Sequence, residues 1–151
     1  MTRTIVEAER TLPYAPADLC RIVGDVRAYP EFIPWLQSLR VLRETPLPEG
    51  GWEGVAEAVV GWKAIKERFA TRVRCAPGEG VVDVALVSGP FKALENRWRF
   101  AAEGEGASKV KFWLAYEFKN RVLQSVVSAN RDKVAKRVMS AFEAEARKRL
   151  G

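Results

Sequence analysis

RVLQSVVSANRDKVAKRVMSAFEAEARKRL, residues 121–150, contains no proline and no glycine. Its apolar residues recur at the spacing of an α-helix, which predicts one long helix from Arg121 to Leu150. The predicted apolar stripe consists of Leu123, Val126, Val127, Val134, Val138, Ala141 and Phe142. A stripe of this length must pack against a second apolar surface, and the inner face of a sheet is the candidate.

The residues before this helix alternate between apolar and polar side chains, as strands do. A short helix is expected over Pro16–Val23, and a proline-bounded apolar turn over YPEFIPWLQSLRV, residues 29–41. A tight reversal is expected at Gly61–Ala64. The predicted strands are Arg3–Leu12, Leu39–Glu44, Trp52–Trp62, Ile65–Cys75, Val81–Val87, Leu94–Phe100 and Val110–Phe118.

This order predicts an α+β fold in one domain over residues 1–151. A curved antiparallel sheet of about six or seven strands would wrap around the long C-terminal helix. Two short helices would follow the first strand. The chain of 151 residues is 48% hydrophobic, which is enough for one core.

Composition excludes several classes of function. No apolar run of about 18 residues is present, so we expect no membrane-spanning segment. The N-terminus lacks a secretion signal, so we expect a cytoplasmic protein. Histidine is absent, which removes the usual general base and the commonest zinc ligand. Cys20 and Cys75 match no metal or redox spacing, and we interpret them as buried thiols.

Five segments together resemble a known family. They are DVRAYPEFIPW (25–35), VGWKAIKERFATRV (60–73), GPFKALENRWRF (89–100), FWLAYEFKNRVL (112–123) and AFEAEARKRL (141–150). In this order they resemble the coenzyme Q-binding branch of the START-like, helix-grip superfamily, which also contains polyketide cyclase-like proteins. The resemblance implies binding of ubiquinone or a related polyprenyl lipid in an apolar cavity between sheet and C-terminal helix. It implies support of respiratory electron transport without catalysis, metal or cofactor.

The resemblance also implies a set of binding residues. The proline-bounded turn would act as a lid over the cavity through Phe32, Ile33, Pro34 and Trp35, although it could equally be a plug that completes the core. Phe91, in a turn, would fold back over the cavity or meet a membrane. The remaining candidates are Trp62, Glu67, Phe69, Leu94, Asn96, Trp98, Phe112, Phe118, Val126, Val127, Asn130, Val134 and Val138.

Three of these candidates are polar residues on predicted apolar faces. Glu67 has the strand parity of Phe69, Asn96 has that of Trp98, and Asn130 falls within the helix stripe. An Asn amide could donate to a quinone carbonyl, which an ionised Glu could not. Each of the three could instead satisfy a backbone group.

Two other classes of function remain as alternatives. A cyclase- or hydrolase-like enzyme could use Glu57, Glu67, Asp83 or Glu117 as a general acid or base. A ribosome or RNA partner agrees with the net charge of +6 and with a similar bacterial toxin that interferes with ribosomal subunit association. Basic residues near the cavity mouth leave peripheral contact with the anionic inner face of the plasma membrane open. No DNA partner is expected.

Overall fold

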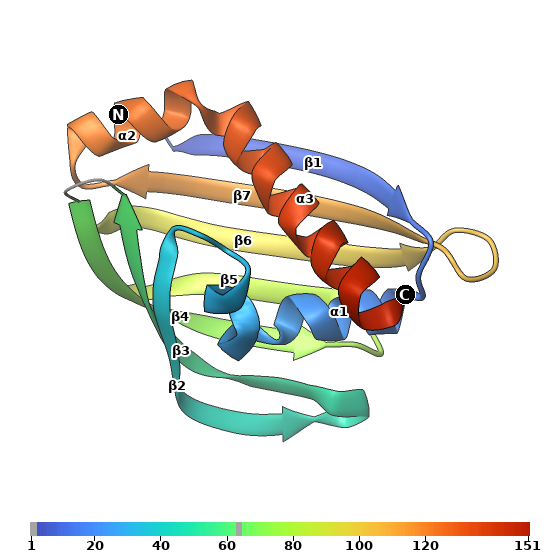
Figure 1. Ribbon diagram of the computed structural model, residues 1–151. Coiled ribbons are helices and arrows are strands. Elements are labelled where there is room, and N and C mark those ends of the chain that lie inside the picture. The colour runs from blue at the N-terminus through green and yellow to red at the C-terminus, as the bar shows by residue number, and fades with distance from the viewer. Residues whose placement is uncertain (1–2, 63–64) are drawn as a thin grey trace.

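The sheet orders its strands β1-β7-β6-β5-β4-β3-β2, all antiparallel, and every helix of α type lies on one side of it (Figure 1). The structure is a computed structural model that describes residues 3–62 and 65–151. Its strands are β1 (Thr4–Leu12), β2 (Leu36–Leu47), β3 (Gly51–Trp62), β4 (Ile65–Ala76), β5 (Val81–Ser88), β6 (Phe91–Ala102) and β7 (Ser108–Phe118). Its helices are α1 (Pro16–Gly24), η1 (Val26–Glu31), η2 (Pro48–Gly50), α2 (Arg121–Ala129) and α3 (Arg131–Leu150).

The α+β prediction is confirmed, with a seven-stranded curved sheet and C-terminal helices on its concave side. We call this side the inner face. Helix α1 packs against β4, β5 and β6, whereas α3 packs against β1 and α1. Strand β1 pairs only with β7, so the first and last strands of the chain lie side by side. Residues 63 and 64 of the predicted reversal lie outside the described residues.

The C-terminal segment differs from its prediction, because two helices meet at Asn130 instead of one running through it. The backbone of Asn130 is not helical, with φ −111° and ψ 18°. Its side-chain amide donates to the carbonyl of Val126 at 2.8 Å, so the residue satisfies the end of α2. Asn130 is exposed. The expectation that it faces the apolar interior is therefore wrong.

The helix break also shifts the buried stripe of α3. The buried residues of this helix are Ala135, Met139, Phe142 and Ala146, while Val134 and Val138 are only half-buried beside them. The helix axis changes at Asn130, so the residues of α3 that face the sheet are not those expected for one continuous helix. The predicted stripe therefore lies beside the centre of the buried face of α3.

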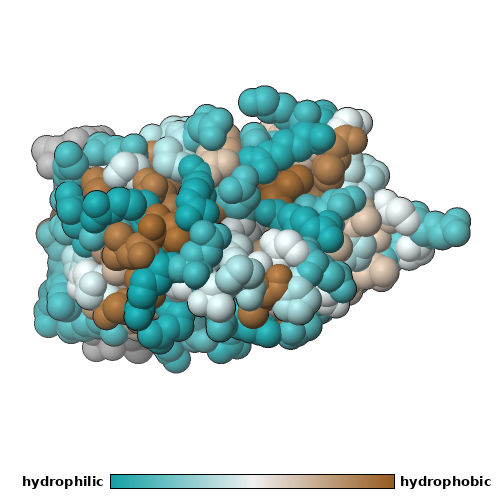
Figure 2. Space-filling model, turned by 90° about the horizontal axis from the view of Figure 1, so that it is seen from below, coloured by the Kyte–Doolittle hydropathy of each residue, from teal (hydrophilic) through white to brown (hydrophobic). Residues whose placement is uncertain are grey.

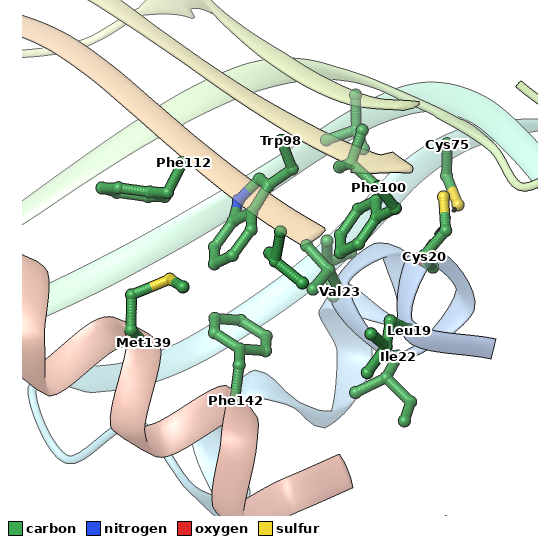
Figure 3. Close-up of a cluster of buried hydrophobic side chains, with 14 of the residues drawn as sticks. Leu19, Cys20, Ile22, Val23, Cys75, Trp98, Phe100, Phe112, Met139 and Phe142 are labelled. Atoms are coloured by element: carbon green, nitrogen blue, oxygen red, sulfur yellow. Dashed lines mark hydrogen bonds between the residues drawn. The ribbon is translucent and has the colours of Figure 1, made fainter. Parts of the chain in front are cut away.

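Phe142 joins α3 to both the sheet and the segment after α1, and Figure 3 shows its ring next to Trp98. Its ring meets Trp98 of β6 edge-on, with centroids 5.1 Å apart, and meets Tyr29 and Phe32 at 5.2 and 5.3 Å. Met139 lies one turn earlier on the same buried face. These contacts hold the C-terminal helix against the end of the sheet that α1 also covers.

Truncating Phe142 should therefore destabilise the whole fold. We expect Phe142→Ala to lower the free energy of unfolding by about 3 to 5 kcal/mol, because it removes a buried ring and leaves a cavity. Urea denaturation followed by circular dichroism measures this change. The exposed Leu150 on the same helix is the control, and Leu150→Ala should cost less than about 1 kcal/mol. Equal effects of the two variants would contradict this role of Phe142.

Candidate ligand-binding site

The inner face is fully covered at one end and only partly covered at the other. Val82, Trp98 and Phe112 are cross-strand neighbours on β5, β6 and β7, and all three are buried. The next row of neighbours toward the α2 end consists of Val84, Asn96 and Leu114, and all three are half-buried. Because alternate residues of a strand share a face, solvent reaches this second row on the inner side.

Further apolar side chains beyond that row are also only half-buried. We define the half-covered inner surface as Phe69, Val84, Leu94, Leu114 and Phe118, from strands β4 to β7. Val127 of α2 and Val138 of α3 pack half-buried against the same core. Large apolar side chains that share one concave face and keep part of their area open are what an apolar ligand contacts.

The covered end of the interior leaves little free space. A cavity of about 10 Å³ lies there, lined by Leu12, Leu19, Ile22, Val23, Trp98, Phe100, Val110, Met139 and Phe142. That volume corresponds to about one water-sized probe, so it admits no quinone ring or prenyl chain. The expectation of an apolar ligand cavity between the sheet and the C-terminal helix is therefore wrong for this end. Space for a ligand would have to come from the half-covered inner surface or from movement of α3.

The residues of the proline-bounded segment differ in how deeply they are buried. Ile33 is buried and belongs to the core, as a plug would. Phe32 and Trp35 are half-buried and pack against that core, which leaves part of each ring open. Pro34 is exposed and does not line the interior.

Three phenylalanines from separate strands meet beside the half-covered inner surface. The ring of Phe91 lies 5.2 Å from Phe69 and 4.6 Å from Phe118, centroid to centroid. Gly89 makes the approach possible, because its φ of 147° suits glycine and a Cβ there would lie 2.4 Å from that of Phe69. Phe91 begins strand β6 instead of lying in the turn, and it is buried, so its position agrees with folding back over the interior and not with meeting a membrane. A role of Phe91 in ligand binding stays a prediction.

Asn96 is one of two polar candidates that the fold keeps on the inner face, and Glu67 is the other. Its amide donates to the carbonyl of Trp113 at 3.0 Å, and its carbonyl accepts from the indole nitrogen of Trp98 at 3.0 Å. The interpretation that it satisfies a backbone group is confirmed. An Asn amide carries two hydrogens, so one donor remains after these contacts with the described residues.

A small polar cluster under α2 escaped the sequence reasoning. Gln124 is buried, and it accepts from the backbone N–H of Phe118 and donates to the hydroxyl of Thr4. The Ser128 hydroxyl lies 2.7 Å from that of Thr4 and 3.5 Å from that of Tyr116. The predicted apolar stripe includes its neighbour Leu123 but not Gln124, because Gln124 is polar. The cluster ties α2 to both β1 and β7.

The carboxylates considered for catalysis are not brought together. Asp83 pairs with Arg99 at 2.7 Å, and Glu57 pairs with Arg40 and Arg68 at 3.3 and 3.5 Å. Their strand parity is opposite to that of the buried inner residues, so they lie on the outer face. Glu117, also of outer parity, lies 3.9 Å from Lys92. Glu67 alone of the four shares the inner face, where it is half-buried.

Of the other predicted residues, Val126 and Val134 are half-buried, and the side chain of Trp62 lies outside the described residues. Trp98 and Phe112 are fully buried, with ring centroids 4.8 Å apart, so they form the floor of the packed end. The predicted binding residues thus divide into buried residues at the packed end and half-buried residues on or near the half-covered inner surface.

The two cysteines lie next to each other although they are far apart in the chain (Figure 3). The Cys75 thiol donates to the backbone carbonyl of Cys20 at 3.6 Å, and both residues are buried, as predicted. The neighbouring Cys75 thiol and burial raise the pKa of Cys20 well above its usual range.

Because both thiols are buried, both should be unreactive in the folded protein. We expect no reaction with Ellman's reagent near pH 8 under native conditions, because the reagent requires an accessible thiolate. Both thiols should react once urea unfolds the chain. Ser140→Cys adds an exposed thiol on α3 and should react at once in the native state. Rapid native reaction of Cys20 or Cys75 would contradict their burial.

Among the described residues, the surface near β2 and β3 carries no single large apolar area. Figure 2 shows hydrophobic residues in separate patches among hydrophilic ones on the face seen from below. Strand β2 is an edge of the sheet and is mostly exposed, and charged side chains such as Arg43 and Glu44 lie along it. Charges on an edge strand oppose pairing with another chain.

Comparison with known proteins places this fold among described families. Residues 12–143 match the model of the family described as polyketide cyclase / dehydrase and lipid transport. The ribosome association toxin RatA of Pseudomonas aeruginosa is 30% identical over 150 residues, which cover 98% of this chain and 99% of that protein. The mitochondrial coenzyme Q-binding protein coq10 of Schizosaccharomyces pombe is 26% identical over 141 residues, which cover 93% and 85%.

A solved structure resembles the chain over its whole length. The solution structure of the 18 kDa protein CC1736 from Caulobacter crescentus superposes with a TM-score of 0.77 at 39% identity. The match covers 100% of this chain and 99% of that one. No helix among the described residues is both long enough and apolar enough to cross a membrane.

Proposed function

The chain belongs to the polyketide cyclase / dehydrase and lipid transport family, and we propose that it binds ubiquinone or a related polyprenyl lipid without changing it chemically. In this proposal the protein presents or carries the lipid for respiratory electron transport. The relative named for coenzyme Q binding supports the choice of ligand class. The observation that carries the proposal is the half-covered inner surface of Phe69, Val84, Leu94, Leu114 and Phe118.

The apolar side chains of this surface suit a prenyl tail. Each isoprene unit that leaves water for an apolar surface gains roughly 3 to 4 kcal/mol, at about 0.8 kcal/mol per CH₂-sized group. A bilayer offers the tail nearly the same gain, so exchange between membrane and protein is close to balanced. A balanced exchange allows both capture and release, which a lipid carrier needs.

The headgroup would be selected by the few polar groups near this surface. A quinone has two carbonyl acceptors, and the remaining amide hydrogen of Asn96 is a donor on the inner face. The Ser128 hydroxyl, which accepts from that of Tyr116, is a further polar group at the α2 end. Polar contacts of this kind give selectivity among ligands with similar apolar tails.

Filling the half-covered inner surface should abolish quinone binding. Val84→Trp places a large ring there, whereas Ala85→Trp places the same ring at the next position, on the exposed outer face. A short-tailed ubiquinone analogue should raise the melting temperature of the wild type and of Ala85→Trp, because a ligand that binds the folded state stabilises it. Val84→Trp should lose this shift, with affinity at least about tenfold weaker.

Lipid extraction tests the same proposal without a variant. Protein purified from a host that makes quinones should yield prenylated quinone in an organic extract analysed by mass spectrometry. A quinone-free extract, together with no melting shift in the wild type, would count decisively against the proposed ligand.

Ribosome association is the second candidate function, and the name of the Pseudomonas aeruginosa relative favours it. If this chain shares that partner, it should co-sediment with ribosomal subunits in sucrose gradients. The binding should weaken steeply with added salt, because contacts to RNA phosphates release counterions. Co-sedimentation that persists unchanged at high salt, or none at low salt, would argue against an RNA-dependent interaction.

A further inference from the structure

The positive charge of the chain is concentrated in one segment. Residues 119–137 contain six cations and one anion, Asp132, whereas the rest of the chain is nearly neutral within a total of +6. All six cations are exposed. None of them makes an ion pair with a carboxylate of the described residues. We call this segment the basic segment; its cations are Lys119, Arg121, Arg131, Lys133, Lys136 and Arg137.

The cations of α3 lie on the side turned away from the sheet. At about 100° per residue, Lys133 and Arg137 lie roughly opposite the buried face of Ala135 and Met139, and Lys136 lies on the flank beside them. They therefore form one continuous exposed strip on the outside of the molecule. Farther along the same helix the pattern changes, because Arg147 and Arg149 pair with Glu143 and Glu145. The unpaired strip thus lies in the half of α3 next to α2.

Helix α2 adds an uncharged exposed face to this strip. Val122 is 71% exposed, which makes it the most exposed large apolar side chain among the described residues. Ser125 and Ala129 share its face, and Val126 is half-buried beside them. Lys119 and Arg121 precede this face in the chain and Arg131 follows it. A small apolar area bordered by cations is typical of helices that bind at a membrane interface.

Helix α2 lies close to the candidate ligand-binding site. The helix begins three residues after Phe118, which belongs to the half-covered inner surface. Figure 1 shows α2 at the same end of the molecule as the end of β7 and the start of β6. A membrane contacted by α2 would therefore lie beside the open part of the inner face.

We propose that the basic segment and the exposed face of α2 dock the protein on an anionic phospholipid surface. The proposal rests on the proposed function, because a lipid could then pass between bilayer and inner face with little exposure to water. The charge complements that of anionic headgroups, and Val122 supplies a side chain for shallow insertion. RNA fits these observations less well, since residues 119–137 contain no aromatic side chain on which a base could stack.

Vesicle binding tests the docking surface directly and needs no quinone. Quinone-free vesicles of phosphatidylcholine, with and without phosphatidylglycerol, are sedimented with the full chain. The wild type should bind only the vesicles with phosphatidylglycerol, and added salt should weaken the binding. The triple variant Lys133→Glu/Lys136→Glu/Arg137→Glu should bind these vesicles at least about 100-fold more weakly than the wild type. Val122→Asp should also bind more weakly, whereas Val122→Leu should bind at least as well as wild type.

A charge-matched control separates the surface from net charge. Arg43→Glu/Arg72→Glu/Lys111→Glu changes the total charge equally at exposed positions on the strands. This control should keep affinity for the vesicles within about twofold of wild type. Equal losses in the two triple variants, or equal binding to vesicles without phosphatidylglycerol, would overturn the proposal. Thermal melts of each variant confirm that it is folded.

Two further results distinguish membrane docking from RNA binding and from quinone binding alone. If the α3 triple variant loses affinity for purified ribosomal subunits while its vesicle binding is unchanged, the basic segment is an RNA-binding surface and the membrane proposal is wrong. If wild-type protein fails to bind anionic vesicles but still shows the quinone-dependent melting shift, docking is wrong and the proposed function stands. Vesicle binding with the expected losses supports docking even where no quinone shift is found.

Discussion

The packing of Phe142 against Trp98 and Phe32 is the contact on which the rest of the structure depends. It joins the C-terminal helix, the middle of the sheet and the proline-bounded segment in one edge-to-face aromatic group. Helix α3 is otherwise a strongly polar helix, since only a narrow set of its side chains is buried. Because this group is at the end covered by α1, the opposite end of the inner face receives less cover. The position of this aromatic group therefore explains both why one end of the inner face is packed and why the other end is only partly covered.

The half-open end combines the features that bear on function. Apolar side chains of four strands keep part of their area exposed there, next to the amide of Asn96 and beneath a helix with an uncharged outer face. The basic segment contains this helix and the first turns of α3. An apolar ligand site, a few polar groups and an external cationic surface thus occur within one region. The covered end supplies rigidity and little volume, since its cavity measures about 10 Å³.

Periodicity in the sequence was enough to predict the fold class, the strands, α1 and the burial of both cysteines. The ordered motifs correctly indicated the START-like family. The break at Asn130 was missed because an Asn inside a helical pattern has no distinct signal until its side chain is seen to bond the preceding turn. The phase error in α3 followed from that break. Phe69 is half-buried and Trp98 is buried because of where α3 crosses the inner face. Strand parity predicts which face a residue is on, but it does not predict the path of α3.

The pairing of β1 with β7 has a consequence for how the chain is made. Thr4 lies opposite Tyr116, and the hydroxyl of Thr4 also contacts Gln124 and Ser128, so the first strand bonds only to the last part of the chain. During translation β1 must wait without a strand partner until nearly the whole polypeptide has emerged. Contacts between residues so distant in sequence slow folding. The native sheet therefore closes in a late step, after β7 has been made.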